Sequence, residues 1–236
     1  MDDRLYFRQL KAGRDFGQGN PVCVGMDNFI YLIGDRVTSE CLVVDPAWDV
    51  ASIVNAAAAD GMKITGALVT HWHPDHVGGP LMNHKVEGLP RLLELAPCKV
   101  HIHKGDVQFV KMMTAISDSD IVAHDSGDKV KAGAIEVECL HTPGHTAGSQ
   151  CFRCGDKLIA GDTLFLQGCG RLDLPGGSVE EMWRTLTERL STIGDDVVLY
   201  PGHDYSGKSA PMGDVRRTNP ILNAPDYASW RRMMGR

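Results

Sequence analysis

Hydrophobic positions along the chain change repeatedly between the spacing of strands and the spacing of helices. Mostly apolar runs at 29–33, 41–44 and 64–69 predict strands. Between the second and third runs a helix is predicted that ends at Gly61, with one apolar face formed by Val50, Ile53, Val54 and Ala57. This order predicts a strand–helix–strand unit that is followed directly by a polar loop.

The clearest helix is predicted over residues 178–193. Ser178 and Glu181 have the spacing of a capping box, in which each side chain bonds to the other residue's backbone N–H. Apolar residues repeat here at helical intervals, at Val179, Met182, Trp183, Leu186, Leu190 and Ile193. We expect this face to pack against a sheet. The chain has no linker or short repeat, so residues 1–236 are predicted to form a single α/β domain.

The charge of the chain bears on its partners. With 236 residues, a net charge of −6 and a pI near 5.9, the chain lacks the basic stripe of a nucleic-acid-binding protein. The pairs Arg216-Arg217 and Arg231-Arg232 are isolated. We therefore expect a small-molecule substrate and no nucleic-acid partner.

Two further features suggest a cytoplasmic protein that does not bind membranes. The N-terminal residues 1–8 lack a basic start followed by an apolar core, and no stretch approaches the roughly 20 apolar residues of a membrane span. The seven cysteines are an odd number without a framework spacing, which favours reduced thiols. Cys151 and Cys154 have a C-x-x-C spacing without a second half, so we interpret them as two unrelated thiols.

The most informative stretch is the loop after the strand predicted at 64–69. It reads Thr70-His71-Trp72-His73-Pro74-Asp75-His76, which places three imidazoles and a carboxylate within six positions. Neutral imidazole and carboxylate are ligands that suit zinc, or iron and manganese where the share of oxygen is larger. A catalytic metal needs about three protein ligands and an open position, so the loop also predicts partners elsewhere in the chain.

Three candidate partners follow other predicted strands. His145 lies in a loop opened by Pro143 and Gly144, Asp162 follows the run 157–161, and His203 follows the run 197–202. Side chains on loops that leave strand ends converge when those ends meet at one edge of a sheet. His101 and His103 share one face of another predicted strand, and we interpret them as ordinary strand residues.

In their order, these motifs resemble those of the metallo-β-lactamase superfamily. The chain has H-x-H-x-D-H, then T-P-G-H-T-x-G-S, G-D-T-L-F and P-G-H-D-Y, and the resemblance extends from about Asn28 to His203. It implies a four-layer αββα sandwich with a metal site at one edge between two sheets. It indicates the substrate much less closely, because different functions are built on this shared scaffold.

Carried over residue by residue, the resemblance implies two metal ions. His71, His73 and His145 would bind the first, Asp75, His76 and His203 the second, and Asp162 would bridge them. Zinc is expected, with iron or manganese as alternatives. Two such ions supply a metal-bound hydroxide at neutral pH, and Asp75 and Asp162 are the expected catalytic carboxylates.

The residues after Asp162 resemble glyoxalase II. In such enzymes the nucleophile attacks a thioester carbonyl, and a cation at the position of Arg171 helps to hold the thiol half of the substrate. A structural salt bridge is the alternative role of Arg171. Glyoxalase II has a helical C-terminal domain, whereas only 33 residues follow His203 here. We therefore expect a hydroxyacylglutathione hydrolase-like enzyme that acts on a thioester or ester with another acyl or thiol group.

Three alternatives stay open. The pattern from Gly168 to Asp173 also resembles the persulfide dioxygenases, which use one iron held by residues that match His71, His145 and Asp162. A catalytically idle binding module is disfavoured because all seven ligand positions are intact. Class B β-lactamases generally lack the bridging aspartate, so β-lactamase activity is expected only as a side activity.

The stretch at about 80–140 is longer than in compact relatives, and we expect it to be an enlarged helical segment. Helices are predicted from near Pro90 and over about 105–116. Apolar residues accompany them, at Leu81, Met82, Phe109, Val110, Met112 and Met113. The segment would form a wall of the substrate pocket, the surface of a homodimer, or an added helical layer without direct function.

Overall fold

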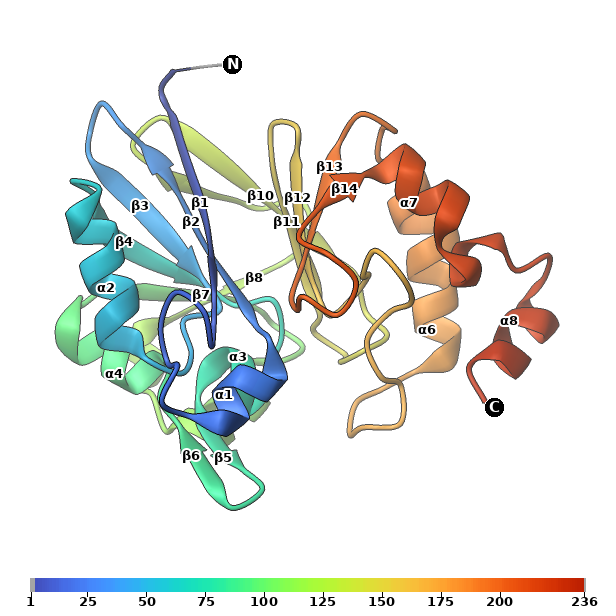
Figure 1. The fold of residues 1–236 in the computed structure, drawn as a ribbon, viewed down its shortest axis with the longest axis horizontal. Coiled ribbons are helices and arrows are strands. Elements are labelled where there is room, and N and C mark those ends of the chain that lie inside the picture. Colours follow the sequence, from blue (N-terminus) through green and yellow to red (C-terminus); the bar gives the residue numbers. More distant parts are fainter. Residues whose placement is uncertain (1–2, 236) are drawn as a thin grey trace.

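Two six-stranded sheets pack face to face at the centre of the molecule (Figure 1). This computed structural model describes residues 3–235, so the first two residues of the N-terminal stretch and Arg236 lie outside it. The first sheet is antiparallel from β1 to β3 and parallel from β3 to β8. Its strands, in spatial order, are β1 (Leu5–Lys11), β2 (Phe29–Asp35), β3 (Glu40–Val44), β4 (Lys63–Leu68), β7 (Lys99–His103) and β8 (Ile121–His124).

The second sheet is mostly antiparallel, and only β12 and β13 form a parallel pair. Its strands, in spatial order, are β14 (Ala210–Pro211), β13 (Val198–Pro201), β12 (Lys157–Gly161), β11 (Gln150–Cys154), β10 (Ile135–His141) and β9 (Lys129–Ala132). A separate small hairpin pairs β5 (Gly79–Leu81) with β6 (His84–Val86).

Strand β2 explains why both faces of a sheet need cover. All seven of its residues are buried, and successive side chains of a strand point to opposite faces. Phe29, Tyr31 and Ile33 pack between the two sheets, whereas Ile30 and Leu32 pack on the outer side. A strand with this pattern is stable only inside a layered structure.

Helices supply the two outer layers (Figure 1). On the first sheet the core includes residues of α2 (Val50–Ala59), α4 (Leu89–Leu95) and α5 (Val107–Thr114). On the second it includes residues of α6 (Val179–Arg184), α7 (Met212–Thr218) and α8 (Tyr227–Met233). The short helices α1 (Pro21–Met26) and α3 (Pro74–Val77) lie below the first sheet in Figure 1. The predicted αββα sandwich is confirmed.

The helix predicted at 178–193 begins as expected, but its second half is not α-helical. Ser178 Oγ accepts a hydrogen bond from the backbone N–H of Glu181 at 3.2 Å. After α6 the chain forms a π-helical turn over Thr185–Arg189 and a 3₁₀ turn over Leu190–Thr192. The buried Thr185 hydroxyl donates to the carbonyl of Pro143 at 2.6 Å. This tertiary contact accompanies the change in helical register, and no spacing of apolar residues could indicate it.

The stretch at 80–140 differs from the expected helical segment. Helices α4 and α5 are present near the predicted positions, with a 3₁₀ turn at Asp118–Asp120. The rest of the stretch consists mainly of strands that complete both sheets, together with the β5–β6 hairpin. The stretch therefore supplies strands to both sheets as well as two helices of the outer layer.

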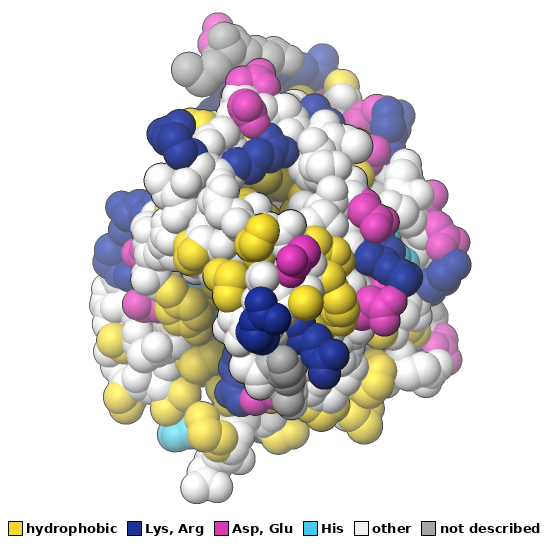
Figure 2. All heavy atoms as spheres, turned by 90° about the vertical axis from the view of Figure 1, so that its right-hand side faces the viewer, with side chains coloured by type: hydrophobic (Ala, Val, Ile, Leu, Met, Phe, Trp, Pro, Cys, Tyr) yellow, Lys and Arg dark blue, Asp and Glu magenta, His cyan; other side chains and the backbone are white. Residues whose placement is uncertain are grey.

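The outer surface is mixed in charge where Figure 2 displays it, on the side of α7 and α8. Basic side chains there lie beside acidic ones, as in the ion pairs of Arg216 with Asp195 and of Arg217 with Asp214. A last 3₁₀ turn, Pro220–Asn223, connects α7 to the segment before α8. Within residues 3–235, no helix combines the length and the apolar character needed to cross a bilayer.

Candidate metal centre

Strand ends from both sheets deliver the predicted ligands to one edge of the sandwich. His71 and His73 follow β4 of the first sheet, whereas His145, Asp162 and His203 follow β10, β12 and β13 of the second. Hydrogen bonds tie the sheets together at this edge: the side-chain Nε2 of Gln150 donates to the Val69 carbonyl at 2.8 Å, and the Phe29 backbone N–H donates to the Gly202 carbonyl at 2.8 Å.

Two glycines allow close contacts between the loops at this edge. Gly161 has a φ of +49°, and a Cβ there would lie 2.5 Å from Thr70 Oγ1. A Cβ at Gly202 would lie 2.4 Å from Asp162 Oδ1. Glycine at 161 leaves room for the end of β12 against Thr70 at the start of the first ligand loop, and glycine at 202 leaves room for Asp162 beside the end of β13.

The described residues contain three groups of buried candidate ligands; Asp45, His71 and His76 form one that overlaps the other two, and those two match the predicted sets. Of these two, one contains His71, His73 and His145, and the other contains Asp75, His76 and His203. Within each group the candidate ligand atoms lie within 4.8 Å of one another. The two groups are those expected from the resemblance, and their division between two ions stays a prediction.

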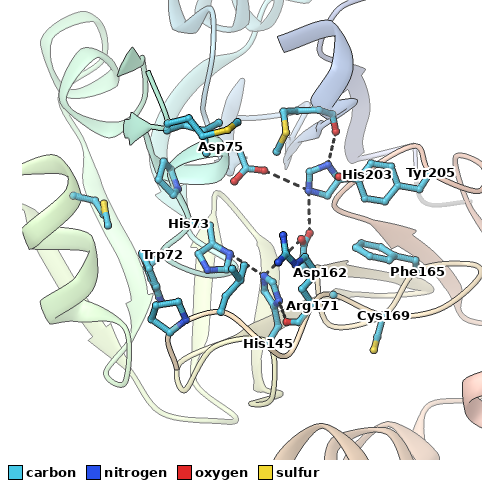
Figure 3. Close-up of a pocket in the computed structure, with 18 of the residues that line it drawn as sticks. Trp72, His73, Asp75, His145, Asp162, Phe165, Cys169, Arg171, His203 and Tyr205 are labelled. Carbon is cyan, nitrogen blue, oxygen red and sulfur yellow. Dashed lines mark hydrogen bonds and ion pairs between the residues drawn. The ribbon is translucent and has the colours of Figure 1, made fainter. Parts of the chain in front are cut away.

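Asp162 lies between the two groups (Figure 3). Its Oδ1 is 3.3 Å from His203 Nε2, and its Oδ2 is 3.7 Å from His145 Nε2. One carboxylate therefore faces a histidine of each group with a different oxygen. This position is compatible with a bridging ligand.

Most of the histidines use one ring nitrogen for a contact with a protein oxygen. These contacts are His71 Nδ1 to Thr70 Oγ1 (3.0 Å), His76 Nδ1 to Asp45 Oδ2 (2.9 Å), His145 Nδ1 to the Arg171 carbonyl (2.7 Å) and His203 Nδ1 to the Met26 carbonyl (2.6 Å). A carbonyl or carboxylate oxygen requires a donating Nδ1–H. The lone pair of Nε2 is then directed into the centre, as in histidines that bind metals.

Burial sets the protonation of the first group. It lowers the pKa of His71, His73 and His145, to about 3 for His73. These imidazoles are therefore neutral at physiological pH. Neutral imidazole is the form that coordinates a metal.

The second group combines carboxylates with histidines. Burial alone would raise the pKa of Asp75 and Asp162, but the neighbouring charges of His76 and His203 outweigh it and hold both pKa values well below the usual range. Against the effect of burial, the carboxylates raise the pKa of His76 and His203. A divalent cation would take the place of the histidine protons and balance the same carboxylates.

Several polar atoms of the centre have no hydrogen-bond partner among residues 3–235. They are His71 Nε2, His73 Nε2 and Asp162 Oδ1, and all are buried. Buried polar atoms are almost always paired, because an unpaired one costs roughly 1–3 kcal/mol. Imidazole nitrogens and a carboxylate oxygen left open in this way fit a divalent cation.

Three residues that the sequence did not single out support the second group. Asp45 accepts from the Thr70 N–H at 2.8 Å as well as contacting His76. Asn28 donates to Asp75 Oδ2 at 3.1 Å, and its own Oδ1 accepts from Trp48 Nε1 at 2.9 Å. Asp45 directly follows β3, so the strand-then-loop position that marked the other ligands was a usable signal for it.

Asp106, immediately before α5, is a further buried carboxylate that the sequence did not indicate. It accepts hydrogen bonds from the Trp72 N–H at 3.1 Å, from Thr146 Oγ1 at 2.7 Å and from the Gly148 N–H at 2.7 Å. Burial raises its pKa to about 6, although these hydrogen bonds act in the opposite direction. One side chain thus connects the loop of His71 and His73 with the loop of His145.

A pocket of about 800 Å³ opens over the centre. Figure 3 shows Trp72 on one side of His73 and Asp162, with Phe165 and Tyr205 on the other. Arg171 lines the pocket, and its guanidinium also pairs with Asp173 at 2.8 Å. Both of the roles considered for Arg171 are therefore compatible with its position.

The remaining sequence candidates lie outside the centre. Cys151 and Cys154 are buried in β11, and all seven cysteines are free thiols. His101 Nδ1 lies 2.8 Å from His124 Nε2, and the His103 ring stacks on His141 with centroids 3.7 Å apart. None of these side chains belongs to the groups of potential metal ligands found among residues 3–235.

Known proteins resemble the chain in sequence over most of its length. The chain is 30% identical over 185 residues to the "Probable polyketide biosynthesis zinc-dependent hydrolase PksB" of Bacillus subtilis (strain 168), covering 78% of this chain and 76% of that protein. It is 36% identical over 204 residues to a hydroxyacylglutathione hydrolase of Rhodopseudomonas palustris (strain BisA53), covering 84% and 71%. It is 31% identical over 199 residues to the mitochondrial persulfide dioxygenase ETHE1 of Homo sapiens, covering 82% and 71%.

The fold and the motifs agree with these relatives. The crystal structure of ETHE1 from Myxococcus xanthus superposes with a TM-score of 0.78 at 26% identity, over 98% of this chain and 90% of that one. A family model described as "Metallo-beta-lactamase superfamily" matches residues 25–203, which include every predicted ligand. The chain therefore belongs to the metallo-β-lactamase superfamily.

Proposed function

We propose that the protein is a dinuclear metal hydrolase that cleaves a thioester or an ester. The position of Asp162 carries the proposal, because its two oxygens face the two ligand groups separately. The named hydrolases among the relatives support the reaction class. Zinc is the metal we propose, since imidazole and carboxylate suit it and one relative is named as zinc-dependent.

Two divalent cations in such a centre lower the pKa of a shared water and polarise a carbonyl oxygen. The residues of the chain orient this chemistry. His71, His73 and His145 would hold one cation, and Asp75, His76 and His203 the other. Asn28 fixes the Asp75 carboxylate by donating to one of its oxygens at 3.1 Å. In this proposal Asp75 orients the attacking water, and the pocket above the centre accepts a small-molecule substrate.

The change Asp162→Ala tests the bridging role. We expect metal occupancy and thioester turnover to fall together, with turnover lower by about a hundredfold or more, because each ion loses a ligand. Elemental mass spectrometry and a thiol-release assay measure the two quantities. The matched control is Asp156→Ala, which removes an exposed aspartate from the β11–β12 turn. Unchanged turnover in a fully metallated Asp162→Ala protein would exclude the bridge.

A persulfide dioxygenase is the second candidate. It is supported by the 31% identical human enzyme and by the Gly-Cys-Gly-Arg pattern at 168–171, where Arg171 pairs with Asp173. This reaction would need one iron held by His71, His145 and Asp162. Oxygen consumption in the presence of glutathione persulfide distinguishes it from hydrolysis.

A further inference from the structure

The pocket over the metal centre has two unlike walls. The wall nearer the β5–β6 hairpin is formed by Trp72, Leu81, Met82 and Met113, and we call it the hairpin wall. The opposite side is mixed: it carries the polar side chains Gln167 and Arg171, together with Phe165, Cys169, Leu174, Pro175 and Tyr205. Figure 3 shows the labelled ligands between Trp72 on one side and Phe165 and Tyr205 on the other. A substrate whose scissile bond lies at the metals must place one half against each wall.

The hairpin wall is apolar and has no charged side chain. Trp72 is held there by stacking on Phe109 of α5, with centroids 5.1 Å apart at 20°. Met113 is on the same helix, and Gly79 at the start of β5 packs closely against it, so a Cβ there would lie 2.8 Å from the Met113 carbonyl. Helix α5 and the hairpin thus support the wall as one unit. Met82, at the tip of the hairpin, is 81% exposed and extends the wall outward.

The pocket contains little charge outside the metal centre. Apart from the metal-centre residues, Arg171 is the one charged side chain that lines it within residues 3–235, and Asp173 already pairs with that guanidinium. A carrier with two carboxylates, such as glutathione, would find a single and partly neutralised cation. An apolar substrate group is therefore better matched to this pocket than a strongly anionic group.

We propose that the acyl half of the substrate is an apolar chain that lies along the hairpin wall. The polar carrier then lies on the side of Arg171 and Gln167, which are polar side chains that line the pocket outside the metal centre. The inference rests on the proposed thioester hydrolase function and names the acyl class that it selects. Leu81, Met82 and Met113 become specificity residues, because their flexible, polarizable or branched side chains contact an alkyl chain without requiring one fixed shape.

A series of thioesters on one neutral carrier tests the proposal. With S-acyl-N-acetylcysteamine substrates from acetyl to octanoyl, we expect kcat/KM to rise by about fourfold for each methylene that the wall buries. Met113→Gln should lower the octanoyl-to-acetyl ratio of kcat/KM by about tenfold, because it places an amide in the apolar wall. Using a ratio within each variant removes differences in folded fraction or metal content.

Met112 provides a matched control on the same helix. It is 67% exposed and does not line the pocket, so Met112→Gln should keep the ratio of the unaltered protein. If thioesters are cleaved equally well whatever the chain length, the acyl inference is wrong while the hydrolase function stands. If the octanoyl-to-acetyl ratio of kcat/KM falls equally in both methionine variants, the proposed role of the hairpin wall is also wrong.

Unreactive thioethers keep the test independent of turnover. The affinity of S-alkyl-N-acetylcysteamines for the metallated protein, measured by calorimetry, should increase with alkyl length and should do so less in Met113→Gln. If no thioester is cleaved, the proposed function fails, and these affinities still decide whether an apolar chain binds. Affinity that does not depend on alkyl length would reject the apolar chain.

Discussion

Two histidines of the metal centre are each oriented by a hydrogen bond to a backbone carbonyl. The Nδ1–H of His145 donates to the Arg171 carbonyl and that of His203 donates to the Met26 carbonyl, so the Nε2 atoms of both rings are directed at the same space. His73 differs, because its Nδ1 lies 2.9 Å from His145 Nε2 and its Nε2 has no partner. This ring has no protein oxygen to orient it, and a cation would supply the missing interaction.

The change His73→Ala separates the two enzymatic functions. A dinuclear hydrolase should lose about a hundredfold or more in turnover and retain about one ion per chain, because a ligand of the first site is removed. An iron dioxygenase held by His71, His145 and Asp162 should keep its metal. Metal content, thioester cleavage and oxygen uptake are measured on the same preparation. His84→Ala, on the exposed β6 strand, is the control. Full iron content with sustained oxygen uptake would contradict the hydrolase.

The ligand residues could be predicted from the sequence because four of them lie within six positions and the other three follow strands. H-x-H-x-D-H at 71–76 predicted further ligands, and the structure brings His145, Asp162 and His203 to the same edge. Asn28 and Trp48 were not predicted, because their role depends on a contact between β2 and a distant loop that no local pattern encodes. A salt bridge was one of the two roles considered for Arg171, and the structure gives Asp173 as its partner.

At the scale of elements, the start of α5 connects two ligand loops through Asp106. Asp106→Ala leaves the Trp72 and Gly148 N–H groups and the Thr146 hydroxyl without this acceptor. We expect the free energy of unfolding to fall by about 3 kcal/mol and metal affinity to fall by about tenfold or more. Denaturant titration and metal competition measure the two effects.

Asp118→Ala is the control for this prediction. Asp118 is 80% exposed and pairs with Lys111 on the surface, so its removal should change stability by less than about 1 kcal/mol. Equal losses in both variants would show that Asp106 has no special role in joining the loops.

Elements were predicted best where the hydrophobic period alone decides them. The buried strand β2 and helix α2 lie where their patterns indicated. The π-helical turn after α6 was missed; it coincides with the contact of Thr185 with Pro143, which the spacing of apolar residues does not indicate. The strands of the 80–140 stretch were underestimated for a related reason: short strands such as β8 and β9, with four residues each, carry little periodicity.

For the molecule as a whole, the fold explains why chemistry is concentrated at one edge. The two sheets bury a shared core that includes Phe29, Tyr31 and Phe152, and the ligand loops leave the strands where that core ends. Gly161 lets the end of β12 approach the Thr70 loop of the first sheet, and Gly202 lets the end of β13 approach Asp162. Ligand residues far apart in the sequence, from His73 to His203, thereby line a single pocket.

The metal content of protein purified without added metal tests the central claim most directly. Elemental mass spectrometry should give about two ions per chain, mainly zinc, if Asp162 bridges two sites. This result would direct the substrate search to thioesters with apolar acyl groups. A single iron per chain would contradict the dinuclear hydrolase and favour the dioxygenase.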